Sequence, residues 1–286
     1  MTKAPGDTCI RLARKAGHLN GMLFVDLTLA RRLEMITARS GRDCANSVRN
    51  APSASVEIAG GIASFTGADS PITQAFGVGL GGPVSESELD ELEDFFVSRG
   101  APVTLELCPF IDGSLVDLLK QRPYRLEEFS NVLVRELSAG ETFERSRPGI
   151  TVRPALTHEA SLFTSIVMEG FAEQVPMSEA LRIVLESFFH RTGSRCLLAS
   201  ADGELAGGAY VAADQSLAEL YGAATRPGFR GRGVQTVLIA DRLAWALEQG
   251  CDMATTTTQP GSISQRNFER AGFRVVYSRT KLVRRP

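Results

Sequence analysis

The stretch Gly228-Phe-Arg-Gly-Arg-Gly-Val-Gln-Thr-Val-Leu238 decides how the chain is interpreted. Two glycines alternate with two arginines, and an apolar helical pattern begins directly afterwards. The first N–H groups of a helix have no partner within the helix, and the helix dipole adds about half a positive charge there. Gly231 and Gly233 let the backbone approach a diphosphate closely, and Arg230 and Arg232 add positive charge. The stretch therefore predicts a phosphate site, with an ordinary basic turn and a nucleic-acid contact as alternatives.

The loop differs from two well-known phosphate-binding motifs. It lacks the Lys-Ser/Thr pair of a P-loop, and it does not follow the first strand of a βαβ unit, as a dinucleotide-binding fingerprint does. Its meaning therefore depends on the rest of the chain.

The composition is that of an ordinary globular protein. The 286 residues are 43% apolar and 22% charged, and this length favours two domains. The net charge of −2 gives no bulk attraction to nucleic acid. Residues 85–95 carry six acids, and the segment from Arg266 onwards carries seven Lys or Arg against one acid. We interpret these segments as a solvated helix face and an exposed edge, and we expect no nucleic-acid partner.

Cysteine and histidine usage argues against a metal site and against a disulfide framework. The five cysteines are scattered and odd in number, no Cys-x-x-Cys pair occurs, and the three histidines lie far apart. No apolar run approaches the roughly 18 residues of a membrane span, and the first ten residues lack the apolar core of a signal peptide. We therefore expect a cytoplasmic protein with no metal and no membrane partner.

The chain contains one pattern twice, at an offset of about 150 residues, which is typical of two copies of one domain. The polar stretch between Ser138 and Pro148 contains Gly and Pro and no apolar periodicity, so the predicted domains are residues 1–138 and residues 149–286. The corresponding segments are Arg99–Pro109 with Gln249–Gln259, Gly113–Leu126 with Gly261–Val275, and Asn131–Arg135 with Thr280–Arg284.

The second copy predicts the element order β-α-α-β-β-β-α-β-α-β-β. Thr157 is the expected cap of its first helix, and Asp202-Gly203 predicts a hairpin turn. The predicted helices are 159–171, 178–191, 233–249 and 262–270, and the predicted strands start at Ile150 and cover 195–201, 204–213, 217–225, 251–257 and two final segments. In the first copy we expect a mostly helical stretch over residues 1–50, strands within 55–66 and 73–79, and a helix over 85–99.

The segment Arg230-Gly-Arg-Gly-Val-Gln235 resembles the Arg/Gln-x-x-Gly-x-Gly/Ala signature of the GNAT superfamily, the acyl-CoA-dependent N-acyltransferases. The downstream segment Thr257–Phe273 is similar to the second CoA-side segment of that superfamily, which ends in Gly-Phe before a strand. The resemblance covers about residues 150–285 by motif and residues 54–137 by layout only. It implies an α+β fold with two GNAT modules, each a mixed, mostly antiparallel twisted sheet flanked by helices. Gln235 stands where the signature has Gly or Ala.

The resemblance also implies where acetyl-CoA binds. In this superfamily the fourth strand splays from the fifth, and the acyl-CoA lies in the gap with its pantetheine along the fourth strand. A backbone N–H on that strand then polarises the thioester carbonyl. The implied cofactor-binding residues are Ala223, Ala224 and Thr225 on the strand, Arg230, Gly231, Arg232, Gly233, Val234 and Gln235 in the loop, and Ser264 and Asn267 on the last helix.

The attacking amine must lose a proton, so the reaction needs a general base or a chain of waters. Glu219 lies on the fourth strand eleven residues before Arg230, a position that resembles that of the base in histone-type members. The alternative is a strand glutamate that faces solvent. Many members use a tyrosine as acid, but Phe268 occupies that position here. Tyr277 and Tyr221 are the substitutes, unless each is a half-buried packing residue.

The first copy lacks the glycine–arginine loop. Its equivalent stretch, Leu80–Leu89, contains Pro83, which has no N–H, and the acids Glu86 and Glu88, which would repel a diphosphate. We therefore expect this module to leave CoA unbound and to shape the amine site. The predicted function is acetyl transfer from acetyl-CoA to a small-molecule or peptide amine by direct attack. A catalytically weak CoA-binding or sensing protein is the alternative, and a homodimer is left open.

Overall fold

A computed structural model describes residues 18–19, 22–49, 51–173 and 177–285. The predicted helical stretch over residues 1–50 therefore lies partly outside the described residues, and the part that is described contains one long helix. The elements of the N-terminal half are β1 (His18–Leu19), β2 (Met22–Leu23), α2 (Leu27–Ser47), β3 (Ala54–Ile58), β4 (Gly61–Phe65), β5 (Gln74–Phe76), α3 (Glu86–Val97), β6 (Val103–Leu107), α4 (Gly113–Leu119) and β7 (Arg125–Glu136).

The C-terminal half follows the predicted order closely. Ser178 and Ser262 cap its second and last α-helices through their side-chain oxygens, and Asp202 and Gly203 both have positive φ, as a tight hairpin turn requires. Its elements are β8 (Ile150–Pro154), η1 (Thr157–Glu159), α5 (Ala160–Phe171), α6 (Glu179–Phe189), β9 (Ser194–Ala201), β10 (Glu204–Asp214), β11 (Leu217–Thr225), η2 (Pro227–Phe229), α7 (Val234–Glu248), β12 (Met253–Thr258), α8 (Ile263–Arg270) and β13 (Arg274–Arg284).

Two local predictions are wrong. Thr157 does not cap a helix with its side chain, because it lies inside η1, and Glu159 closes the turn instead by accepting a hydrogen bond from the Leu156 N–H at 2.8 Å. The two final strands are one strand, β13, whose register with its neighbour β7 shifts between Val275 and Tyr277 and again after Lys281. The strand continues through both shifts.

One sheet of eleven strands carries both halves, in the order β3-β4-β5-β6-β13-β7-β12-β11-β10-β9-β8. Only β5 with β6 and β11 with β12 are parallel among the neighbouring strands of this sheet. The other pairs are antiparallel. The predicted α+β class with a mixed, mostly antiparallel sheet is confirmed.

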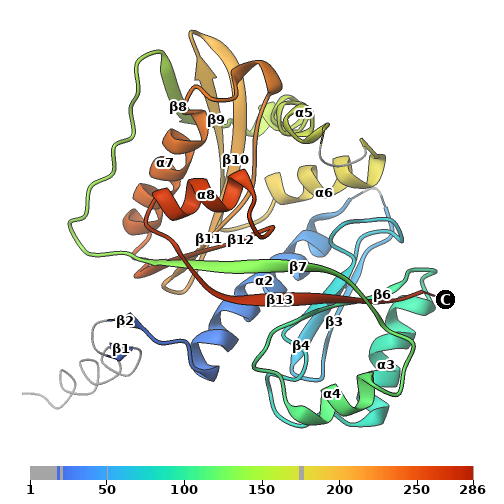
Figure 1. Ribbon diagram of the computed structural model, residues 1–286. Coiled ribbons are helices and arrows are strands. Elements are labelled where there is room, and N and C mark those ends of the chain that lie inside the picture. The colour runs from blue at the N-terminus through green and yellow to red at the C-terminus, as the bar shows by residue number, and fades with distance from the viewer. Residues whose placement is uncertain (1–17, 20–21, 50, 174–176, 286) are drawn as a thin grey trace, which may run out of the picture.

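The two halves exchange their last strands. β7, from the N-terminal half, pairs with β12 along the whole of that strand, and β13, from the C-terminal half, pairs with β6. The two exchanged strands are also paired with each other, and both run across the middle of the molecule (Figure 1). The division at residues 138 and 149 stays a prediction, but each half depends on a strand that the other supplies.

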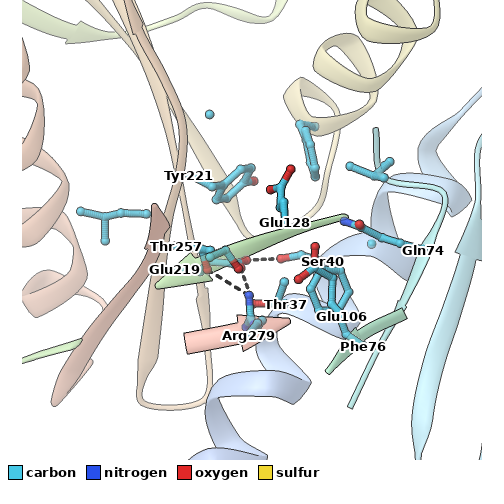
Figure 2. Close-up of a pocket in the computed structure, with 16 residues that line it drawn as sticks. Thr37, Ser40, Gln74, Phe76, Glu106, Glu128, Glu219, Tyr221, Thr257 and Arg279 are labelled. Atoms are coloured by element: carbon cyan, nitrogen blue, oxygen red, sulfur yellow. Dashed lines mark hydrogen bonds between the residues drawn. The ribbon is translucent and has the colours of Figure 1, made fainter. Parts of the chain in front are cut away.

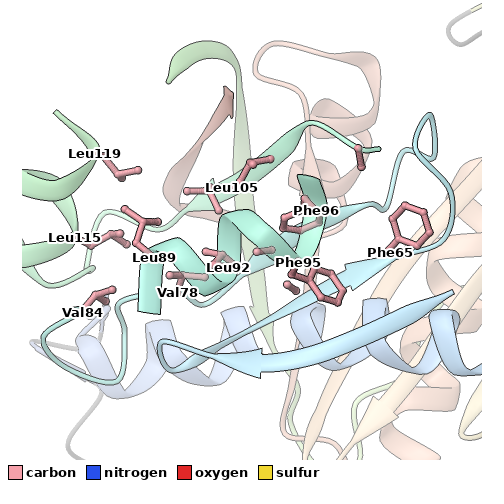
Figure 3. Packing of buried hydrophobic residues seen from close by; sticks show 14 residues of the cluster. Phe65, Val78, Val84, Leu89, Leu92, Phe95, Phe96, Leu105, Leu115 and Leu119 are labelled. Atoms are coloured by element: carbon pink, nitrogen blue, oxygen red, sulfur yellow. The ribbon is translucent and has the colours of Figure 1, made fainter. Parts of the chain in front are cut away.

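Each half has a cluster of buried apolar residues of its own, and two further clusters join residues of both halves. In the N-terminal half, α3 lays Leu89, Leu92 and Phe96 against the strands, where all three are fully buried (Figure 3). In the C-terminal half, α7 packs on β8 to β11 through Val234, Val237 and Leu238, while α5 covers β10 and β11 (Figure 1). The long helix α2 packs on β3, β4 and β5 and also reaches α6 and β11 of the other half. It therefore joins the two halves beside the exchanged strands.

Three further observations concern membrane helices, cysteines and metal sites in the part of the chain that the structure describes. No helix in it has the length and apolar character needed to cross a membrane. The four cysteines within it are buried and free. No group of three or more His, Cys, Asp or Glu within it could hold a metal ion.

Candidate active site

The site begins where β11 and β12 separate. The two strands pair in parallel from Leu217 with Met253 to Glu219 with Thr255, and no further. β11 nevertheless continues to Thr225, and β12 continues to Thr258. The last residues of β11 therefore lack a strand partner on the β12 side, and Glu219 lies at the point where the gap opens.

A bulge lies in the part of β11 that pairs with β10 but no longer with β12. Tyr221 pairs with Tyr210 of β10, but the next pair is Ala224 with Gly208, so two residues of β11 oppose one of β10. Gly222 is one of the two and has φ of 54°, and a Cβ on it would lie 2.5 Å from the Tyr210 ring. Only glycine fits there, and the bulge changes the direction of the backbone just before the predicted pantetheine-binding residues Ala223, Ala224 and Thr225.

The glycine–arginine loop leads into α7 without a side-chain cap. Gly231 and Gly233 have φ of 76° and 92°, and Gly233 is the N-cap residue. Among the described residues, no side chain accepts a hydrogen bond from the first N–H groups of α7. Val234 is buried in the core, so only its backbone can face a ligand at this end. The start of this helix is therefore open to an anion.

The two arginines of the loop already have partners. Arg230 forms an ion pair with Glu173 and donates to the Gly170 carbonyl at 3.1 Å, and Arg232 forms an ion pair with Asp202. They fix the loop against its neighbours, which reduces the free positive charge that was predicted for them. Arg147, which the sequence analysis missed, lies against Gly233 and has no ion-pair partner among the described residues.

Gln235 has a structural role that explains its departure from the signature. Its side-chain amide donates to the Thr225 hydroxyl at 2.9 Å and so ties the first turn of α7 to the end of β11. The two other predicted contacts, Ser264 and Asn267, lie on α8, which packs beside α7. Ser264 is exposed and Asn267 is half-buried.

A cavity of about 300 Å³ lies in front of Glu219, between the two halves (Figure 2). The C-terminal half contributes Glu219 to Gly222 of β11, together with residues of α6, β12 and β13. The N-terminal half contributes residues that the sequence analysis did not identify. They are Thr37, Ser40 and Gly41 of α2, Ile72, Gln74 and Phe76 at β5, Glu106 of β6, and Glu128 and Ser130 of β7.

The Glu219 carboxylate is held by hydroxyl groups of the other half. Its side chain is only 9% exposed. The Thr37 hydroxyl donates to one carboxylate oxygen at 2.9 Å, and the Ser40 hydroxyl donates to the other. Arg191 lies 3.8 Å from the second oxygen. Glu219 therefore does not face bulk solvent, which was the alternative, but lines a cavity as an oriented and partnered carboxylate.

The two candidate tyrosines lie in different surroundings. Tyr221 lines the cavity, accepts a hydrogen bond from Arg191 at 3.5 Å and stacks on Tyr210. Burial raises the pKa of Tyr221, so it stays protonated at neutral pH. Tyr277 is absent from the cavity lining, and its hydroxyl donates to the buried Glu34 at 2.7 Å. This position gives no support to Tyr277 as a proton donor.

Phe268, at the usual position of the acid, is an ordinary core residue. It is buried and packs edge-on against Phe273, with 5.0 Å between the ring centroids.

Comparisons with known proteins agree with this geometry. Residues 161–273 match the "Acetyltransferase (GNAT) family". A GCN5-related N-acetyltransferase from Kribbella flavida is similar in structure with a TM-score of 0.60 and 17% identity, over 87% of this chain and 95% of that one. A tandem GNAT protein from the clavulanic acid biosynthesis pathway has a TM-score of 0.58 and 13% identity, over 90% of this chain and 94% of that one. No curated protein sequence matches.

Proposed function

Since the C-terminal half carries a GNAT-family acetyltransferase domain within a tandem GNAT fold, we propose that this chain transfers the acetyl group of acetyl-CoA to a primary amine. The observation that carries the proposal is the position of Glu219. It lies where β11 leaves β12, in a cavity, on the strand that leads to the uncapped start of α7. Chemistry then belongs to residues 149–286, and residues 1–138 support it.

Acetyl-CoA would bind in the gap that β11 leaves beside β12. Its diphosphate would lie at the start of α7, against the N–H groups of the Arg230–Gln235 loop and near Arg147, which carries the free positive charge there. Its pantetheine would run along Ala223, Ala224 and Thr225, where a backbone N–H can polarise the thioester carbonyl. Ser264 and Asn267 of α8 would contact the other side.

The proposed reaction is a direct attack. The amine reaches the cavity as an ammonium, and Glu219 takes its proton, directly or through one water. The amine nitrogen bonds to the acetyl carbon, the carbon–sulfur bond breaks, and the thiolate leaves with the bonding electrons. The nitrogen then gives up its second proton, which reprotonates the group that has protonated the thiolate, so the products are a neutral amide and the free thiol. Tyr221 is the proposed donor of a proton to that thiolate, because its oxygen accepts from Arg191 and its own proton is free to face the cavity.

The test measures thiol release from acetyl-CoA with a panel of primary amines. We expect the Glu219→Gln variant to lose about 10²–10⁴-fold in kcat, the usual worth of a positioned base, with its affinity for CoA unchanged. Glu204→Gln changes an exposed carboxylate on the neighbouring strand β10 and is the control. Equal rates in wild type and Glu219→Gln would contradict the base assignment. Tight CoA binding without release for any amine would favour a sensing protein.

A further inference from the structure

Carboxylates line the cavity on more than one side, with Glu106 and Glu128 on the wall opposite Glu219 (Figure 2). Glu106, Glu128 and Glu219 point into the cavity from the three strands β6, β7 and β11, and Arg279 of β13 is the cation that lines it (Figure 2). The Arg279 guanidinium is already used, because it donates to Glu34 at 2.8 Å, to Thr257 at 3.0 Å and to Thr37 at 3.3 Å. Its hydrogen bonds therefore go to residues other than the three lining carboxylates.

Two of these carboxylates share a single ammonium group. Lys281 of β13 lies in register with both Glu106 and Glu128, and its Nζ is 3.3 Å and 3.5 Å from their carboxylate oxygens. Across the cavity, Arg191 is shared between Glu219 and Asp43, at 3.8 Å and 3.4 Å. Asp43 also pairs with Arg42 at 3.7 Å, and Arg42 pairs with Glu57 at 2.8 Å. With Glu34, the connected set is six carboxylates against four cations, which leaves a surplus of two negative charges.

The wall also holds polar atoms without a partner. Among the described residues, Glu106 Oε2 and Ser130 Oγ are buried and make no hydrogen bond. The side chain of Glu106 is 7% exposed. Burial raises the pKa of Glu106, and the positive charges of Lys281 and Arg279 offset this rise only in part. A buried acceptor without a donor is costly, so these atoms indicate a group that a ligand supplies.

We propose that the acceptor is a small amine with a second cationic group, which binds to Glu106, Glu128 and Ser130 while its reacting nitrogen faces Glu219. This rests on the proposed function. The ammonium group of the arriving amine balances one of the two surplus negative charges. Transfer of its proton to Glu219 does not change the total charge of the site. A second cationic group on the acceptor would balance the remaining negative charge. At roughly 30 Å³ per water molecule, a cavity of about 300 Å³ holds about ten non-hydrogen atoms, which suits a small diamine.

The test compares 1,4-diaminobutane with n-butylamine, which differ only in the second amine, as acceptors for the full chain with acetyl-CoA. We expect kcat/KM to be at least about tenfold higher for the diamine, and we expect Glu128→Gln to bring the ratio close to one while the KM for acetyl-CoA stays unchanged. Glu128 is 41% exposed, so this variant should fold. Glu127→Gln is the matched control, since Glu127 is the adjacent exposed glutamate of β7, does not line the cavity and pairs with Arg285 instead.

The outcomes separate this inference from the function on which it rests. Transfer to both amines at equal kcat/KM, or a ratio that Glu128→Gln and Glu127→Gln change alike, overturns the acidic subsite and leaves the acetyltransferase intact. No transfer to any amine overturns the proposed function itself. In that case, titration of the diamine into the CoA-loaded protein still tests the subsite, and binding that Glu128→Gln does not weaken overturns it.

Discussion

The two halves place a helix at the same point of the fold, between two strands that pair in parallel, and these helices begin differently. At α3, Ser85 Oγ accepts from the Glu88 N–H at 3.3 Å, and the Glu88 carboxylate accepts from the Ser85 N–H at 2.8 Å. The hydrogen bonds from Ser85 lower the pKa of Glu88, so it is a carboxylate at neutral pH. At α7, the N-cap is Gly233, which offers no side chain.

From this difference we expect side chains, more than backbone layout, to decide which half binds a diphosphate. The start of α3 is occupied by the helix's own anion, whereas the start of α7 is open. The N-terminal half contributes instead a strand, β7, and the wall of the cavity. One half is therefore expected to bind the cofactor, and the other to orient Glu219 and to hold the acceptor.

The largest expected effect follows from removing the N-terminal half. In a fragment of residues 149–286, β12 loses β7 as its partner along its whole length, and β13 loses β6 and β7. We expect the fragment to show neither a cooperative unfolding transition nor binding of acetyl-CoA, by circular dichroism and calorimetry. Co-expression with residues 1–148 should restore both. A folded fragment that binds acetyl-CoA would mean that the halves are independent.

A pair of glycine substitutions tests the loops before the two helices. Gly231 and Gly82 both have positive φ, 76° and 132°, and a Cβ on either would have no neighbour within 4 Å. Alanine at either position therefore imposes backbone strain without a clash, about 1–2 kcal/mol at Gly231 in the left-handed region and more at Gly82, whose φ lies beyond that region. We expect Gly231→Ala to weaken acetyl-CoA binding about tenfold in a calorimetric titration, and Gly82→Ala to leave it unchanged. Equal losses would assign the effect to general destabilisation.

A charge substitution makes α7 resemble α3. Gln235→Glu keeps the shape of the side chain and places a carboxylate in the first turn of α7, where α3 has Glu86 and Glu88. Repulsion of the diphosphate should weaken acetyl-CoA binding about fivefold, and the loss should shrink in high salt. Gln235→Ala removes the hydrogen bond to Thr225 without adding charge and serves as the control. A loss that salt does not change would point to that hydrogen bond instead.

The smallest effect is expected at the cap of α3. Ser85→Ala removes the capping oxygen and should lower the free energy of unfolding by about 1 kcal/mol, a fall of about 2 °C in Tm. Acetyl-CoA should bind the variant as it binds wild type, and no second site should form. A gain in CoA binding would show that the cap alone had closed this half.

Local patterns predicted the order of elements and the loop at Gly231, because glycine spacing, capping residues and apolar periodicity are short-range properties. The strand exchange could not be predicted in this way, since the pairing of β7 with β12 joins residues such as Val134 and Thr255 that lie far apart in sequence. For the same reason no local pattern singled out Thr37 and Ser40 of α2 as partners of Glu219. Tyr221 and Tyr277 looked equivalent until their partners, Arg191 and Glu34, separated them.

The stoichiometry of acetyl-CoA binding tests the contrast between the two halves most directly. In an isothermal titration of the full chain we expect one site per chain, weakened by Gly231→Ala and by Gln235→Glu and untouched by Gly82→Ala and by Ser85→Ala. Two sites per chain, or a single site that responds to the changes before α3 and not to those before α7, would contradict the account.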